Sequence, residues 1–277
     1  MSPRMPRLVF AMPQLVSVMS ELDPRAIVSP SARVGPGVRI GAFAVVGDEV
    51  ELGEGCVLEP HAVVRGPARI GRKNLFDSFC SVGGDPQDLK FSGERTELVV
   101  GDENHFREFS TVSRGTKQGG GVTRIGNANL FMAYSHVAHD CIVGSHTVFA
   151  NGATLAGHVA VDDYASVGAF SPVHQFCRVG RYAYVGACTV ITQDVPPFSR
   201  VVTERNTYCY GVNSVGLERR GFDRQRLETI ERAFRLLLRS KLNTSQAIEQ
   251  IRAQLNGSPD VRELVEFIES AQRGLHK

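Results

Sequence analysis

The chain has 277 residues, of which 42% are hydrophobic and 22% are charged, as in an ordinary globular protein. A net charge of +2 does not favour a nucleic-acid-binding protein, which usually carries a dominant basic field. No run approaches the roughly 20 apolar residues of a membrane span. The six cysteines form no C-x-x-C pair, so we predict a reduced, cytoplasmic protein without a zinc or redox motif.

The N-terminus needs separate interpretation. Two arginines precede a short apolar run, Leu8 to Met12, which faintly resembles a secretory signal. Pro13 interrupts this run and no small-residue cleavage site follows it. We therefore interpret residues 1–20 as a disordered extension, or as translation that starts upstream of a true beginning at Met19.

From Val34 onward, every sixth residue is apolar over long stretches. Nine such residues come in succession, three more begin at Val100, and twelve run from Ile125 to Ile191. The next residue is often Gly, and the one four places later is usually small. A three-sided coil of 18 residues explains this hexad, with the large side chain inside, the small one near a corner, and glycine permitting a tight turn. We predict a parallel β-helix over residues 21–213, with coils about 4.8 Å apart.

Two interruptions, at residues 84–97 and 114–124, break the period. Long insertions in a regular solenoid usually build binding sites, and disordered linkers are the alternative. The repeat ends at Pro196, and apolar residues then follow helical spacing. We predict a C-terminal helical domain over residues 214–277, in which Ser258 caps the last helix.

Four of the eight histidines lie in one short span, at positions 136, 139, 158 and 174. The 18-residue period places His158 one coil above Asp140. It also places Gly157 above His139 and Gln175 one coil further, so that His139 faces a glycine with an amide about 9–10 Å away. Since an imidazole beside a carboxylate is a typical general base, this column is the candidate site.

Hexad position separates these residues from the interior. His139 and Gln175 occupy the third position and His158 the fourth, and we predict that they point outward, into the cleft between subunits if a trimer forms. Four cysteines occupy the fifth, inward position and are predicted to be interior hydrophobes rather than nucleophiles: Cys56, Cys80, Cys141 and Cys177. The remaining histidines are interpreted as surface or interface residues: His61, His105, His146 and His276.

Six motifs surround the histidines. They are N-L-F-M-A-Y-S-H-V-A-H-D-C (129–141), L-A-G-H-V (155–159), V-H-Q-F-C (173–177), D-P-Q-D-L-K-F-S-G-E (85–94), R-G-T-K-Q-G-G-G (114–121) and Q-D-V-P-P (193–197). Together they resemble the UDP-N-acetylglucosamine O-acyltransferase family, from about residue 24 to the C-terminus. The resemblance implies a left-handed β-helix, although parallel crossovers are ordinarily right-handed. It also implies a homotrimer that needs no cofactor or metal.

The resemblance implies transfer of an (R)-3-hydroxyacyl chain from acyl carrier protein to the 3-hydroxyl of UDP-N-acetylglucosamine, the first step of lipid A synthesis. It identifies His139 as the general base and Asp140 as its partner. It identifies the N–H of Gly157 as the donor to the oxyanion, with no acyl-enzyme intermediate. Ala187 falls at a position that the family uses as a ruler for acyl chain length.

The other residues that the resemblance implies bind substrate. His136, His158, His174 and Gln175 would position it, Asp88 and Lys90 would hold the sugar and diphosphate, and Asn213, Arg219 and Arg220 would contact the nucleotide. Without the resemblance we would interpret Asp88 and Lys90 as an ordinary solvated loop pair. By themselves, Arg219 and Arg220 are as typical of a charge cluster at the start of a helix as of a binding site. Val215 and Ser113 stand where the family often has Glu, and His or Asn, which puts the uridine and sugar contacts in question.

Three other functions fit hexapeptide repeats. An N-acyltransferase that acts later in the same pathway carries an additional N-terminal uridine-binding domain, whereas about twenty residues precede the repeats here. The γ-type carbonic anhydrases are trimeric β-helices that bind zinc through three histidines, for which His136, His139 and His158 are candidates. A non-catalytic scaffold gives no reason for the column of His139, Gly157 and Gln175.

Overall fold

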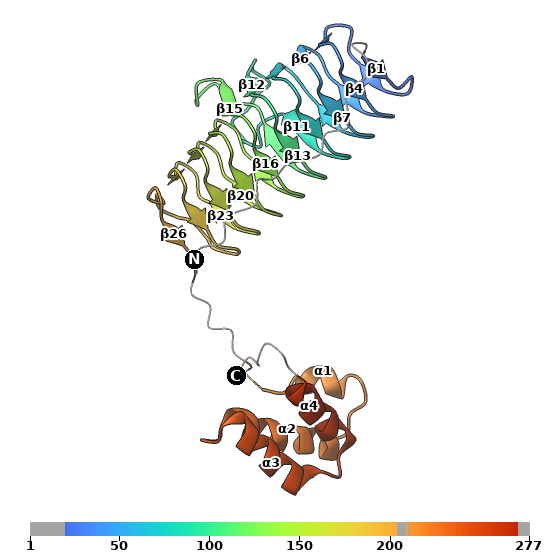
Figure 1. Cartoon of the computed structure of the whole chain (residues 1–277), viewed down its shortest axis with the longest axis vertical. Coiled ribbons are helices and arrows are strands. Elements are labelled where there is room, and N and C mark those ends of the chain that lie inside the picture. Colours follow the sequence, from blue (N-terminus) through green and yellow to red (C-terminus); the bar gives the residue numbers. More distant parts are fainter. Residues whose placement is uncertain (1–19, 204–208, 210, 271–277) are drawn as a thin grey trace, which may run out of the picture. The chain divides into compact units, whose positions relative to one another are not determined.

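The computed structural model describes residues 20–203, 209 and 211–270. The chain forms two compact units that divide between Thr203 and Glu204 (Figure 1). Apart from Ser20, the predicted N-terminal extension lies outside the described residues, and so does His276. No helix in the described part of the chain has the length and apolarity needed to cross a membrane.

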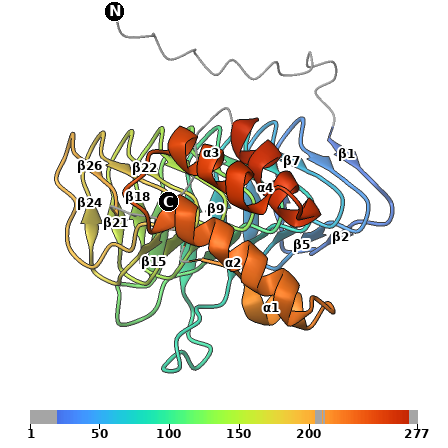
Figure 2. The ribbon, with the colours of Figure 1, turned by 90° about the horizontal axis from the view of Figure 1, so that it is seen from below.

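Three parallel sheets form the sides of the first unit (Figures 1 and 2). The first contains β1 (Glu21–Leu22), β4 (Arg39–Ile40), β7 (Val57–Leu58), β10 (Leu75–Phe76), β13 (His105–Phe106), β16 (Leu130–Phe131), β19 (Val148–Phe149), β22 (Ser166–Val167), β25 (Tyr184–Val185) and β26 (Arg200–Val201). The second contains β2 (Ile27–Val28), β5 (Val45–Val46), β8 (Val63–Val64), β11 (Ser81–Gly84), β14 (Thr111–Ser113), β17 (His136–Val137), β20 (Thr154–Leu155) and β23 (Pro172–Val173). The third contains β3 (Arg33–Val34), β6 (Val50–Leu52), β9 (Ala68–Ile70), β12 (Glu97–Val100), β15 (Val122–Ile125), β18 (Ile142–Val143), β21 (Ala160–Val161) and β24 (Arg178–Val179).

From β1 to β25, consecutive strands belong to different sheets, so the chain winds once around a triangle every three strands. In uninterrupted coils each residue pairs with the one 18 places later, as Leu130 does with Val148 and Val148 with Ser166. The hexad therefore places strands as predicted. Each first-position side chain from Ile40 to Ile191 is buried.

Aromatic and small side chains share the interior. Phe76, Phe106, Phe131 and Phe149 stack with ring centroids 4.9 to 5.1 Å apart, one in each successive coil. The fifth hexad position is buried as well, and the prediction that four cysteines face inward is confirmed. Interior packing of this density tolerates little change of volume.

Polar residues at the fifth position satisfy one another. Asn104 donates from Nδ2 to Asn74 Oδ1 at 3.0 Å, and Asn129 N donates to Asn104 Oδ1 at 3.0 Å. One coil further, Thr147 donates to Asn129 Oδ1 from its N–H at 2.7 Å and from its hydroxyl at 2.8 Å. These bonds between coils allow amides to be buried at little cost.

The hexad glycines have a different role from the one predicted. At Gly53 a Cβ would lie 2.5 Å from the carbonyl oxygen of Gly71 in the next coil, and φ is not positive. The left-handed conformation falls two residues later, at the fourth position, where Asp140 has φ of 60° and Tyr164 has 61°. At the second position glycine is therefore needed because adjacent coils approach closely, whereas most of the turns at the fourth position are made by residues with side chains.

Both insertions leave the same corner of the triangle. The chain leaves the second sheet at Gly84 and enters the third at Glu97, then leaves the second again at Ser113 and enters the third at Val122. Figure 2 shows the first insertion projecting from the β-helix. The turn after β17 lies at this corner in the next coil, so the insertions meet the histidine column.

The second unit is a small helical domain. It contains α1 (Ser214–Glu218), α2 (Arg224–Leu238), α3 (Thr244–Leu255) and α4 (Pro259–Glu269). Leu237, Ile251 and Val265 lie in its separate core. Ser258 caps α4 as predicted, accepting a hydrogen bond from the N–H of Val261.

Candidate active site

The turn after β17 brings His139 and Asp140 together. His139 Nδ1 lies 2.8 Å from Asp140 Oδ2. The Asp140 side chain is fully buried, while that of His139 is 13% exposed. A proton on Nδ1 is therefore held by the carboxylate, which leaves Nε2 as the nitrogen able to accept a proton, as in a general base.

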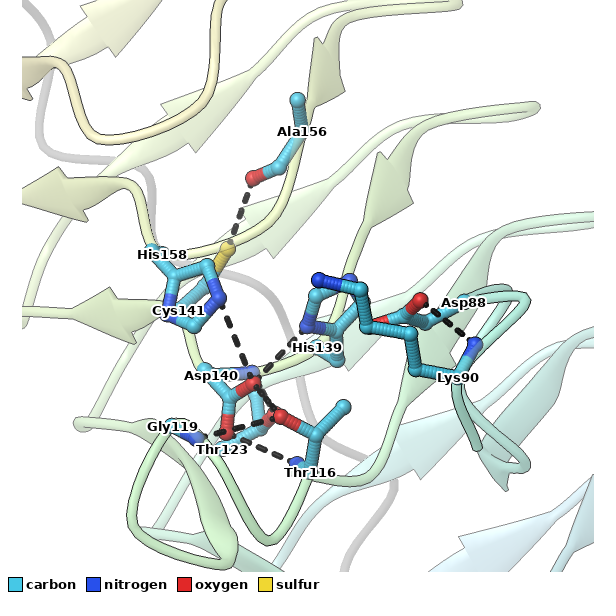
Figure 3. A network of polar contacts seen from close by, with 10 residues as sticks. All are labelled: Asp88, Lys90, Thr116, Gly119, Thr123, His139, Asp140, Cys141, Ala156 and His158. Carbon is cyan, nitrogen blue, oxygen red and sulfur yellow. Dashed lines mark hydrogen bonds and ion pairs between the residues drawn. The ribbon is translucent and has the colours of Figure 1, made fainter. Parts of the chain in front are cut away.

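The second insertion covers Asp140. The N–H of Thr116 donates to Oδ1 at 2.8 Å, and the Thr116 hydroxyl donates to Oδ2 at 2.6 Å. Gly119 passes so close that a Cβ there would lie 2.0 Å from Asp140 Cγ. The insertion therefore closes over the Asp140 carboxylate (Figure 3).

Gly157 lies against the imidazole of His139, as the 18-residue period predicts. A Cβ on Gly157 would lie 2.5 Å from His139 Cε1 and 2.8 Å from Nε2. Within the described residues, the N–H of Gly157 has no hydrogen-bond acceptor. This geometry gives the imidazole its space and leaves a backbone donor beside Nε2.

His158 contacts the same carboxylate from the next coil. Its Nε2 lies 3.7 Å from Asp140 Oδ2, and its ring meets that of His139 edge-on at 5.2 Å. Phe176, one coil further, stacks on His158 at 4.5 Å. Sequence reasoning missed Phe176, although the period that relates Asp140 to His158 leads to it.

His136 and His174 lie at the edge of this cluster. Burial, and then the nearby His139, lower the pKa of His136, and its Nδ1 lies 2.7 Å from Thr111 Oγ1. This histidine is therefore neutral at physiological pH. His174 and Gln175 are exposed, with His174 Nδ1 3.1 Å from the Gln175 carbonyl.

The first insertion presents Asp88 and Lys90. Asp88 accepts a hydrogen bond from the N–H of Lys90 at 2.9 Å, and the Lys90 side chain is exposed. Arg114 anchors this loop, since its guanidinium donates to the carbonyl of Gly83 at 2.7 Å and pairs with Asp85. Sequence reasoning missed the role of Arg114, because no period relates it to the loop.

Known relatives cover most of the chain. An acyl-(acyl carrier protein)–UDP-N-acetylglucosamine O-acyltransferase from Stenotrophomonas maltophilia is 50% identical over 254 residues, which are 92% of this chain and 97% of the relative. The chain belongs to the UDP-N-acetylglucosamine O-acyltransferase family. A family model described as domain 2 of UDP N-acetylglucosamine O-acyltransferase matches residues 194–276, and a bacterial transferase hexapeptide model matches residues 31–66 and 123–157.

Solved structures of the family agree. LpxA from Acinetobacter baumannii is 37% identical, with a TM-score of 0.66 over 92% of this chain and 99% of that one. The UDP-N-acetylglucosamine acyltransferase of Francisella novicida is 36% identical, with a TM-score of 0.65 over 92% of this chain and 93% of that one. The predicted left-handed parallel β-helix with C-terminal helices is thereby confirmed.

Three residues that the family resemblance assigns to the nucleotide belong to the second unit. Asn213 caps α1, accepting from the N–H of Gly216 at 3.2 Å, and lines a pocket of about 450 Å³ with Glu231, Arg235 and Arg239. Arg219 is the C-cap of α1, Arg220 follows it, and both are exposed. Their nucleotide contacts stay a prediction.

Ala187 lies at another corner of the triangle than the dyad. Ala187 is exposed in the turn after β25, at the corner between the first and second sheets, whereas His139 lies between the second and third. Ser113 is buried beside Gly84, where the pairing of β11 with β14 is irregular. The chain-length role of Ala187 stays a prediction.

Within the part of the chain that the structure describes, His136, His139 and His158 do not form the three-histidine group of the zinc alternative. The possible metal ligands that the described residues bring within 4.8 Å of one another are His139, Asp140 and His158. His136 is outside this group and faces Thr111. Because both Asp140 oxygens already accept hydrogen bonds, this arrangement is that of a hydrogen-bonded dyad, and the family does not favour the zinc alternative.

Cys141 is adjacent to the dyad in sequence and is expected to be dispensable. Its thiol is fully buried, and burial raises its pKa to about 12. We therefore expect Cys141→Ala to retain the turnover of the wild type in a steady-state assay. Loss of turnover at an unchanged melting temperature would contradict this assignment.

Proposed function

We propose that this acyltransferase moves an (R)-3-hydroxyacyl chain from acyl carrier protein to the 3-hydroxyl of UDP-N-acetylglucosamine, the reaction that begins lipid A synthesis. The dyad of His139 and Asp140 beneath Gly157 carries the proposal. It lies in a chain 50% identical to an enzyme whose name states this donor and acceptor.

The proposed mechanism uses a general base. His139 Nε2 accepts the proton of the sugar hydroxyl as its oxygen attacks the thioester carbonyl. The buried Asp140 stabilises the imidazolium, and the N–H of Gly157 donates to the oxyanion. As the C–O bond forms and the C–S bond breaks, the imidazolium returns the proton to the thiolate of the carrier protein.

The remaining residues would position substrate. These residues are His136 with its neutral imidazole, His158 with its ring stacked on Phe176, and the exposed His174 and Gln175. Lys90 offers a mobile ammonium to the diphosphate, with Asp88 beside it. In the second unit, Asn213, Arg219 and Arg220 would contact the nucleotide, and Ala187 would limit the acyl chain.

The surface supports a homotrimer. Phe43, Phe79, Phe109 and Tyr134, with His61 among them, stack along the corner between the first and second sheets, and the four large rings are 44% to 64% exposed. Outward residues of the second sheet carry no fixed charge: Val45, Val63, Ser81, Thr111, His136, Thr154 and Pro172. The third sheet instead presents Arg33, Arg69, Arg124 and Arg178. Exposed apolar surface of this extent favours contact between copies of the chain.

We also propose that the protein is located in the cytoplasm. Its buried cysteines are unpaired thiols, and thiols stay reduced in that compartment.

The test is an assay of the full-length protein with UDP-N-acetylglucosamine and (R)-3-hydroxyacyl thioesters of acyl carrier protein of several lengths. We expect a 3-O-acyl product, identified by mass spectrometry, with a preference for one length. A parallel assay uses the acceptor with an amine at C3. Transfer to the amine alone would show that the acceptor carries an amine rather than a hydroxyl at C3, and one zinc per chain with carbonic anhydrase activity would support the zinc enzyme.

A further inference from the structure

The Thr116 side chain is the direct link between the second insertion and the dyad. Its residue is 1% exposed. The hydroxyl accepts a hydrogen bond from the N–H of Gly119 at 3.2 Å and lies 2.6 Å from Asp140 Oδ2. With one partner a donor and the other a carboxylate, the hydroxyl proton points to Asp140.

Thr116 holds both oxygens of the Asp140 carboxylate. Its N–H donates to Oδ1 at 2.8 Å, while its hydroxyl shares Oδ2 with His139 Nδ1 at 2.8 Å. The backbone of Asp140 is held too, because its N–H donates to Thr123 Oγ1 at 2.8 Å. Rotation of this carboxylate would break two charge-assisted hydrogen bonds at once.

We propose that Thr116 is a positioning residue for the acyl transfer, so that the catalytic unit is Thr116, Asp140 and His139 in series. By fixing the plane of the carboxylate, Thr116 keeps the His139 N–H bound at Nδ1 and Nε2 directed at the acceptor hydroxyl. Groups that position a catalytic imidazole in this way usually matter for turnover more than for binding. The inference rests on the proposed function.

The insertion thereby has a defined task. Arg114 is the first residue of the insertion, and its guanidinium donates to the carbonyls of Gly66 and Gly83 at 2.9 and 2.7 Å. Two residues later Thr116 meets Asp140, and Gly119 closes over the carboxylate. This loop, which lies outside the repeat, brings a buried hydroxyl to Asp140 Oδ2.

Thr147 supplies a matched structural control. It too is 1% exposed, and its N–H and hydroxyl both donate to one side-chain oxygen, Asn129 Oδ1, at 2.7 and 2.8 Å. It contacts none of the three residues of the proposed unit. Thr116→Val and Thr147→Val therefore remove comparable buried hydroxyl bonds, one inside the unit and one outside it.

The experiment compares Thr116→Val, Thr116→Ser and Thr147→Val in the full-length protein. We expect Thr116→Val to lower kcat by about 10–100-fold while KM for both substrates stays within about twofold. Thr116→Ser keeps the hydroxyl and should restore kcat to within about threefold of wild type. Thr147→Val should lower the melting temperature but leave kcat at the wild-type value.

Equal kcat for wild type and Thr116→Val would overturn the inference, and so would a serine variant as slow as the valine one. If Thr116→Val does not fold, Thr116→Ala takes its place with the same expectations, since it also keeps the backbone N–H. A wild-type protein without O-acyltransferase activity, or a fully active His139→Ala, would instead refute the proposed function.

Discussion

His139→Ala should lower kcat by about 10²–10⁴-fold, the usual contribution of a general base. The imidazole of His139 is the group that Asp140 orients beneath Gly157. Its removal leaves no base at this place to accept the hydroxyl proton. Steady-state kinetics with acyl carrier protein thioester and UDP-N-acetylglucosamine measure the effect. Because His139 is partly exposed and outside the β-helix interior, the fold should survive the change.

His146→Ala is the matched control. His146 is exposed and stacks on Tyr164 at 4.9 Å, at the corner between the third and first sheets. It should keep wild-type kcat, and size-exclusion chromatography should give the wild-type elution volume for both variants. Wild-type turnover by His139→Ala, with the protein folded, would remove the base from the mechanism.

Gly157→Ala should lower kcat on the order of 10²-fold, because a displacement of about 1 Å at a catalytic group has this effect. The added Cβ would lie 2.5 Å from His139 Cε1, so the ring has to shift from its place beside Asp140. The backbone N–H of residue 157 is retained, so the loss reports the displaced imidazole rather than a missing oxyanion donor.

Gly47→Ala is the control for this second change. Gly47 follows β5 at the same corner of the triangle, and its nearest neighbour to an added Cβ is Arg65 Cα, at an ordinary 3.4 Å. Its kcat should equal that of wild type. A crystal structure of Gly157→Ala should show the His139 ring moved, and an unmoved ring with full activity would refute the steric argument.

The hexad determined more of this site than the identity of any single residue did. The six-residue period predicts which side chains face inward, and the 18-residue period predicts which residues stack. The two together correctly predicted the buried cysteines and the position of Gly157 against His139. Both results follow from local, repeating geometry, in which each coil repeats the backbone of the one below.

The tertiary structure alone decided what surrounds the dyad. The insertions have no period, so nothing in their spacing states that Thr116 meets Asp140 or that Arg114 ties the two loops to one corner. The role of the hexad glycines was likewise decided by the tertiary structure. It depends on the distance between adjacent coils rather than on the backbone conformation of the glycine itself. The repeat therefore specified the scaffold and the column of His139, Gly157 and Gln175. The burial of Asp140 and its hydrogen bonds depend instead on contacts between the aperiodic loops and that column. These contacts are set by the closure of long chain segments, which a repeating sequence pattern does not describe.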